Sequence, residues 1–112
     1  MDGTQKIILV NFEGVKNMRE METRELLRRL ENELEFCYNT SLKCLKVLGK
    51  SRTLKDYISA VQNEYERIET TIDMLLCIDA IGEYDYLFMQ RRLHTKAESY
   101  LIELSIKYAE IK

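Results

Sequence analysis

The spacing of apolar residues is the feature that most tightly constrains the fold of this 112-residue chain. From residue 22 onward, apolar side chains recur every three or four positions, which is the period of one face of an α-helix. The chain has no proline and only four glycines, at positions 3, 14, 49 and 82, so few residues disfavour helical backbone. We therefore predict an all-α protein.

The first predicted helix covers approximately residues 19–48. Acidic residues crowd its beginning and basic residues its end, as the helix dipole favours, and Gly49 follows as a suitable C-terminal cap. Its apolar seam repeats every seven residues, as in a coiled coil, with one polar exception at Ser41. The seam consists of Leu27, Leu30, Leu34, Cys37, Ser41, Cys44 and Leu48.

The second predicted helix covers approximately residues 53–81. It opens with Thr53, and Asp56 follows three residues later. This spacing resembles a capping box, in which each side chain accepts a hydrogen bond from the backbone N–H of the other residue. Its seam keeps a regular four-three alternation as far as a single acid, Asp79. That seam consists of Leu54, Ile58, Val61, Tyr65, Ile68, Ile72, Leu75 and Asp79.

The third predicted helix covers approximately residues 84–111 and follows a turn at Gly82. Thr95 and Glu98 could form a second capping box and so divide this helix in two. Between a break near Thr95 and one continuous helix, we favour the continuous helix. Its apolar stripe consists of Tyr86, Leu93, Ala97, Tyr100, Leu104 and Ile111.

Residues 1–18 are predicted to form a short N-terminal arm. Within it, the segment from Lys6 to Phe12 suits an extended strand, although no other part of the chain does. A lone strand needs a partner. The segment could pair with its copy in a homodimer, add to the sheet edge of another protein, or pack on the helices as a short helix or extended arm.

These elements predict a single helical domain of residues 1–112, because the length suits one core. Short turns at Gly49 and Gly82 require neighbouring helices to run antiparallel, so we expect an antiparallel bundle of three long helices. Three helices enclose a thin core. We therefore expect a homodimer to complete the burial of apolar surface.

The sequence holds no constellation typical of catalysis, and we predict that the chain is not an enzyme. His94 is the only histidine, and Cys37 and Cys44 lie about 10.5 Å apart along a helix, too far to share a disulfide or a zinc ion. We expect structural roles for all three residues. Phosphate-binding glycine-rich loops are absent as well, so we predict neither a metal nor a cofactor.

An apolar and aromatic corner between the second and third helices is the main candidate for binding a protein. The end of the second helix is apolar on nearly every side, around Cys77, which indicates either an interface or a locally denser core. Asp79 lies at a seam position there, so we expect its charge to meet Arg91, Arg92, a tyrosine hydroxyl or a helix N-terminus. The candidate residues are Met74, Ile78, Ile81, Tyr84, Leu87, Phe88 and Met89.

A nucleic-acid interface on the third helix is the alternative site. Its basic residues are Arg91, Arg92, Lys96 and Lys107. Glutamates on the same helix dilute this group, and the net charge of the chain is −2. Because affinity for a phosphate backbone depends on positive charge, the pattern indicates only weak binding.

We therefore expect a non-enzymatic protein–protein interaction module that acts as a small regulator, adaptor or inhibitor. The alternatives are a small nucleic-acid-binding transcriptional regulator and a structural subunit of a larger assembly. Abundant Ile, Lys, Glu and Tyr are typical of AT-rich genomes, which suits a phage or mobile-element protein directed at a host protein. No segment resembles a signal peptide or a membrane span of ~20 apolar residues, so we expect a cytoplasmic protein without membrane contact.

Overall fold

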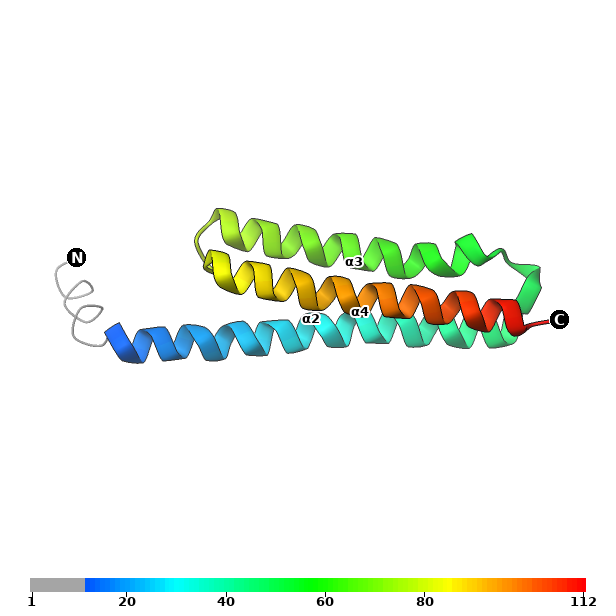
Figure 1. Ribbon diagram of the computed structural model, residues 1–112, viewed down its shortest axis with the longest axis horizontal. Helices are drawn as coiled ribbons and strands as arrows, with labels where there is room; N and C mark the ends of the chain where they lie inside the picture. The colour runs from blue at the N-terminus through cyan, green and yellow to red at the C-terminus, as the bar shows by residue number, and fades with distance from the viewer. Residues whose placement is uncertain (1–11) are drawn as a thin grey trace.

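The computed structural model describes the backbone of residues 12–112 and the side chains of residues 22–112. It contains three long helices, α2 (Phe12–Leu48), α3 (Leu54–Cys77) and α4 (Glu83–Glu110), and a short 3-10 helix, η1 (Gly49–Ser51). In Figure 1, α3 and α4 form a hairpin that lies along α2, and consecutive helices run in opposite directions. The predicted all-α, three-helix bundle is therefore confirmed.

The first helix begins earlier than expected. Helix α2 starts at Phe12 rather than near residue 19, so the second part of the predicted arm is helical backbone. A single glycine at position 14 disfavours a helix by only about 1 kcal/mol, which does not outweigh its neighbours. Figure 1 shows that α2 extends past the α3–α4 turn. The rest of the strand-like segment expected at residues 6–12 lies outside the described residues.

The connection between α2 and α3 forms as its residues predict. Thr53 is the N-cap of α3: its Oγ1 accepts a hydrogen bond from the Asp56 backbone at 3.3 Å, and Asp56 Oδ2 accepts one from the Thr53 backbone at 3.1 Å. Gly49 follows α2 with a left-handed φ of 52°, which glycine adopts without strain. Tyr57 donates to the Gly49 carbonyl at 2.7 Å, which fixes the turn against α3.

Helix α3 ends at Cys77, several residues before the predicted end near residue 81. Asp79 has a left-handed φ of 61°. Its backbone N–H donates to the Leu76 carbonyl, and the Ala80 N–H donates to the Leu75 carbonyl, which is the Schellman pattern of helix termination. The expectation that Asp79 lies in the seam and pairs with Arg91 or Arg92 is therefore wrong, because Asp79 is an exposed turn residue.

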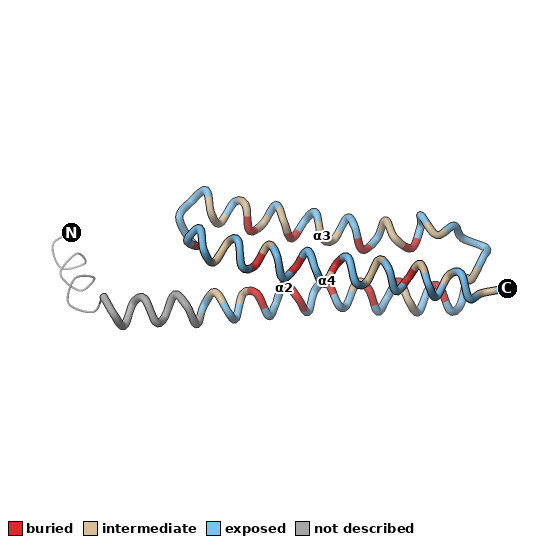
Figure 2. Tube along the Cα trace, in the orientation of Figure 1, coloured by how far each residue is buried: buried red, intermediate tan, exposed pale blue. Residues whose placement is uncertain are grey.

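After Leu34, the buried residues of α2 depart from the predicted seven-residue seam and follow an eleven-residue spacing (Figure 2). Eleven residues complete three turns at 3.67 residues per turn, close to a straight helix, whereas a seven-residue repeat needs a left-handed supercoil. The predicted seam of α2 therefore rotates out of the core, and Cys44 and Leu48 are exposed while Leu45 is buried. The pairs at this spacing in α2 are Leu27 and Tyr38, Leu30 and Ser41, and Leu34 and Leu45.

Helix α4 is continuous from Glu83 to Glu110, as favoured, and Thr95 lies within it on an exposed face. The side of α4 that faces the core holds Met89, Leu93 and Leu104, each with no exposed surface. Tyr100 stacks on Tyr38 of α2 with 4.3 Å between ring centroids. These contacts hold α4 against α2 along the middle of the bundle.

Candidate interaction surface

The predicted corner at the α3–α4 turn divides into buried and exposed residues. Met89 is completely buried and Ile81 is 7% exposed, so these two belong to the core. The others are exposed, from 47% for Leu87 to 91% for Tyr84. We call the exposed set the distal patch. It consists of Met74, Ile78, Tyr84, Leu87 and Phe88.

Local structure explains why these apolar residues reach solvent. The early end of α3 leaves Ile78 in the turn, where it is 71% exposed. Tyr86 in the first turns of α4 donates to Asp73 of α3 at 2.5 Å, which fixes how α4 leaves the turn. This hydrogen bond and partial burial raise the pKa of Tyr86. The distal patch is thus built on two helices whose ends are tied together.

The segment that forms the distal patch also carries acidic residues. Between residues 68 and 90 the chain has five acidic side chains and no lysine or arginine. The segment around the α2–α3 connection has the opposite charge, because residues 36–55 carry five basic side chains and no acidic one. Figure 1 shows that the α2–α3 and α3–α4 connections lie at opposite ends of the bundle. The α3–α4 turn is therefore acidic and apolar, whereas the α2–α3 connection is basic.

The basic group of α4 is partly neutralised within the bundle. Arg92 Nε donates to Glu31 of α2 at 2.6 Å, and Lys96 Nζ donates to the other oxygen of Glu31 at 2.7 Å. Glu31 is 8% exposed. Burial raises the pKa of its carboxyl, but the hydrogen bonds from Lys96 and Arg92 outweigh burial, so the pKa lies below its ordinary value.

Two of the four predicted nucleic-acid contacts are therefore engaged with Glu31. The other two, Arg91 and Lys107, are exposed. They lie about 24 Å apart along α4 at a rise of ~1.5 Å per residue. The structure does not gather the four side chains into one basic patch.

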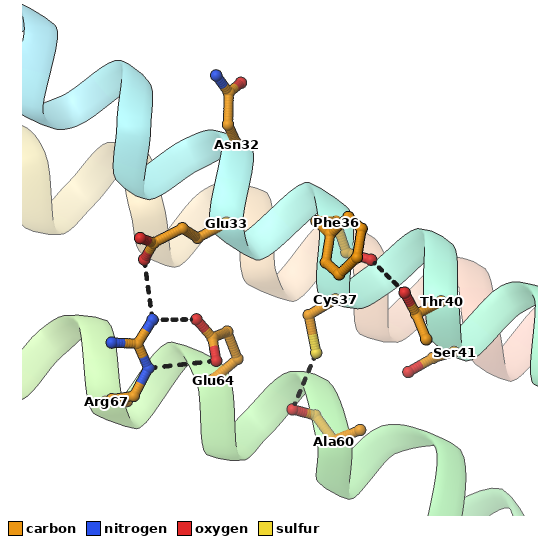
Figure 3. A pocket seen from close by; sticks show the side chains of 9 residues that line it. All are labelled: Asn32, Glu33, Phe36, Cys37, Thr40, Ser41, Ala60, Glu64 and Arg67. Carbon is orange, nitrogen blue, oxygen red and sulfur yellow. Dashed lines mark hydrogen bonds and ion pairs between the residues drawn. The ribbon is translucent and has the colours of Figure 1, made fainter.

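A groove between α2 and α3 also exposes an aromatic side chain, which the sequence did not point to (Figure 3). Phe36 is 74% exposed because it lies on the outer face of α2, one position before Cys37. Arg67 of α3 pairs with Glu33 at 2.8 Å and with Glu64, so the charged groups of the groove satisfy one another. Cys37 donates to the Ala60 carbonyl at 3.3 Å.

The surroundings of Cys37, and those of Tyr65 and His94, do not favour nucleophilic catalysis at these residues. Burial, with a smaller effect of Glu64, raises the pKa of Cys37, which keeps its thiol protonated and weakly nucleophilic. His94 is within 3.3 Å of the Tyr65 hydroxyl and 3.5 Å of Glu98, at a mostly exposed position. Burial, then Glu69, raises the pKa of Tyr65 to about 12, so this hydroxyl is a poor general base.

Cys44 and Cys77 are both exposed thiols. The expectation that Cys44 packs in the core is wrong, because the eleven-residue repeat buries Leu45 in its place. Among the side chains of residues 22–112, no three His, Cys, Asp or Glu groups come together as a metal site.

No helix in the described part of the chain has a stretch apolar enough to cross a bilayer. Comparison of the chain with protein-family models, with curated protein sequences and with solved structures finds no match in any of the three.

Proposed function

We propose that this chain is a non-enzymatic protein-interaction module that binds another protein through the distal patch and so acts as a small regulator, adaptor or inhibitor. The observation that carries the proposal is the exposure of five large apolar side chains at and around the turn that connects α3 and α4. Contiguous exposed apolar surface is typical of interaction sites, and methionine and aromatic residues are enriched in them. Burying one such side chain contributes about 1.5–3 kcal/mol, so a few supply useful affinity.

The acidic surroundings indicate the chemistry of the partner. Five carboxylates lie in residues 68–90, the segment that forms the distal patch, and this segment has no lysine or arginine. A partner that presents apolar side chains flanked by lysine or arginine is complementary to this surface. We therefore infer that the partner is a protein with a basic, apolar contact region.

A nucleic-acid partner is less well supported. Arg92 and Lys96, which such a function requires, already form ion pairs with Glu31. Reassigning them to phosphates leaves the Glu31 carboxylate buried and unpaired, which is unfavourable.

A role as a permanent subunit of a larger assembly uses the same distal patch and differs only in the lifetime of the complex. A cytoplasmic phage or mobile-element protein directed at a host protein is a further proposal, supported by composition alone.

The test is capture of a partner from a lysate of the source organism, with matched variants. Ile78→Asp/Leu87→Asp places two charges in the distal patch without touching the core, since both side chains are exposed. Phe36→Asp is the control, because it adds a charge at an equally exposed apolar position on α2. We expect one protein to bind the wild type and the control and to be lost from the double variant, with helical circular dichroism unchanged in all three.

Two outcomes contradict the proposal. Equal capture by the double variant removes the distal patch as the binding site. Recovery that disappears after nuclease treatment shows that the chain associates through nucleic acid, which supports the alternative function instead.

A further inference from the structure

The outward face of α4 carries a second line of apolar and small side chains, opposite the line that enters the core. Its four apolar members are between 53% and 91% exposed, and the two small members are exposed as well. A helix that is apolar on two opposite faces is normally covered on both. We call this line the α4 outer stripe. It consists of Tyr84, Phe88, Thr95, Ser99, Ile102 and Ile106.

The outer faces of the other helices differ. Opposite its buried residues, α3 exposes polar side chains such as Asn63 and Glu66. On the described part of α2, amide and basic side chains separate the exposed Phe36 from the exposed Val47 and Leu48. Only α4, among the described helices, has an outer apolar line that extends over most of its length. We therefore expect a partner that covers this line to extend along most of α4.

A second copy of α4 has that length and matches the stripe when it runs antiparallel. With Thr95 of each copy on a two-fold axis, Phe88 lies opposite Ile102 of the second copy, and Tyr84 lies opposite Ile106 of the second copy. The small side chains of Thr95 and Ser99 lie near the axis, where they permit close approach of the two helices. Apolar side chains thus meet apolar ones at both ends of the contact.

Charges beside the stripe favour the same arrangement. In the antiparallel pairing, Arg91 lies near Glu98 of the second copy. Two-fold symmetry repeats this opposite-charge pair. A parallel pairing instead sets Arg91 beside its own copy, and like charges at a contact are unfavourable.

The charges of the two connections between helices agree with the pairing along α4. Because residues 68–90 are acidic and residues 36–55 are basic, antiparallel copies place the α3–α4 turn of one copy beside the α2–α3 connection of the other. Opposite charges therefore face each other at both ends of the dimer. This attraction favours the antiparallel arrangement over the parallel one.

We propose that two copies of the chain form an antiparallel, two-fold symmetric dimer through the α4 outer stripe. The dimer covers Tyr84 and Phe88 and leaves Met74, Ile78 and Leu87 of the distal patch open to another protein. Dimerisation does not depend on the proposed partner binding. Variants at Ile102 and Ile106 lie outside the distal patch, so failure of one proposal is distinguishable from failure of the other.

Sedimentation velocity tests the dimer. We expect the wild type to have the mass of two copies, and Ile102→Asp/Ile106→Asp to have the mass of one copy with unchanged helical circular dichroism. Val47→Asp, an exposed apolar position on α2, is the control and stays dimeric. A wild type that sediments as a single copy at all concentrations, or a dimer that survives the double substitution, overturns the proposal.

Disulfide cross-linking tests the direction without introducing charge. In a chain whose three cysteines are replaced by serine, Phe88→Cys and Ile102→Cys are prepared separately, mixed and oxidised. We expect the 88–102 disulfide to dominate in the mixture. A dominant 88–88 disulfide indicates parallel helices and overturns the proposal, as does the absence of any cross-linked dimer.

Discussion

At the scale of single residues, backbone conformation at Asp79 determines where α3 ends. Its φ of 61° is left-handed, a conformation that glycine adopts freely and that most other residues adopt at an energetic cost. Aspartate tolerates it better than most residues, so the turn forms without a glycine. The apolar spacing of the sequence continues through this position, which is why periodicity alone placed Asp79 in a helix seam.

Replacing Asp79 by glycine and by alanine tests the turn, because both variants remove the same carboxylate. In the left-handed conformation, we expect Asp79→Gly to be more stable than Asp79→Ala by about 1 kcal/mol. Urea denaturation measures the difference. If α3 continued through residue 79, the order would reverse, since alanine is favoured over glycine inside a helix by a similar amount.

The Glu31 cluster is the second residue-scale determinant. Its carboxylate accepts hydrogen bonds from Arg92 and Lys96, and its pKa is lowered. We expect Glu31→Gln to lower the free energy of unfolding by about 1.5–3 kcal/mol at neutral pH, the range for a hydrogen bond to a charged group. Because the folded-state pKa lies below the unfolded one, this stabilisation is complete above the ordinary value of 4.5 and is lost as pH falls further.

Chemical denaturation of both proteins over a range of pH checks this prediction. The wild type and Glu31→Gln should converge in stability under acidic conditions. A difference that persists unchanged at low pH would show that packing of the side chain, and not its charge, stabilises the bundle.

At the scale of the helices, the eleven-residue spacing in α2 decides which of its side chains enter the core. Leu45 is 2% exposed, whereas Leu48, a position of the predicted seven-residue seam, is 43% exposed. We expect Leu45→Ala to lower the free energy of unfolding by about 2–5 kcal/mol, as for a buried leucine. Leu48→Ala should change it by less than about 1 kcal/mol. Thermal and urea unfolding of the two variants measure these effects. A larger loss of stability in Leu48→Ala than in Leu45→Ala would support the seven-residue seam instead.

The predictions that held were those with a local physical cause. Thr53 and Asp56 cap α3 because their side chains reach each other's backbone, and Gly49 ends α2 because it adopts a left-handed conformation. Leu27, Leu30 and Leu34 are buried in either repeat. The errors accumulated with distance, since a seven-residue repeat drifts by ~20° per heptad from a straight helix. Cys44 and Leu48 lie where that drift is greatest.

At the scale of the whole molecule, surface composition could be predicted more readily than surface geometry. The excess of apolar residues near the α3–α4 turn was visible in the sequence, but the separation of buried Met89 and Ile81 from exposed Met74, Ile78 and Leu87 depends on where α3 stops. The ion pairs of Glu31 with Arg92 and Lys96 join residues more than sixty positions apart. Such pairs depend on the packing of α2 against α4, which the sequence spacing does not specify.

The central claim is that the distal patch is the surface that binds another protein. Hydrogen–deuterium exchange of the chain, alone and with the protein that it captures, tests this claim most directly. We predict slower exchange on binding in the segment from Met74 to Phe88 and no change in residues 22–34 of α2. Slower exchange confined to residues outside the segment from Met74 to Phe88 would contradict the claim and place the binding surface elsewhere on the bundle.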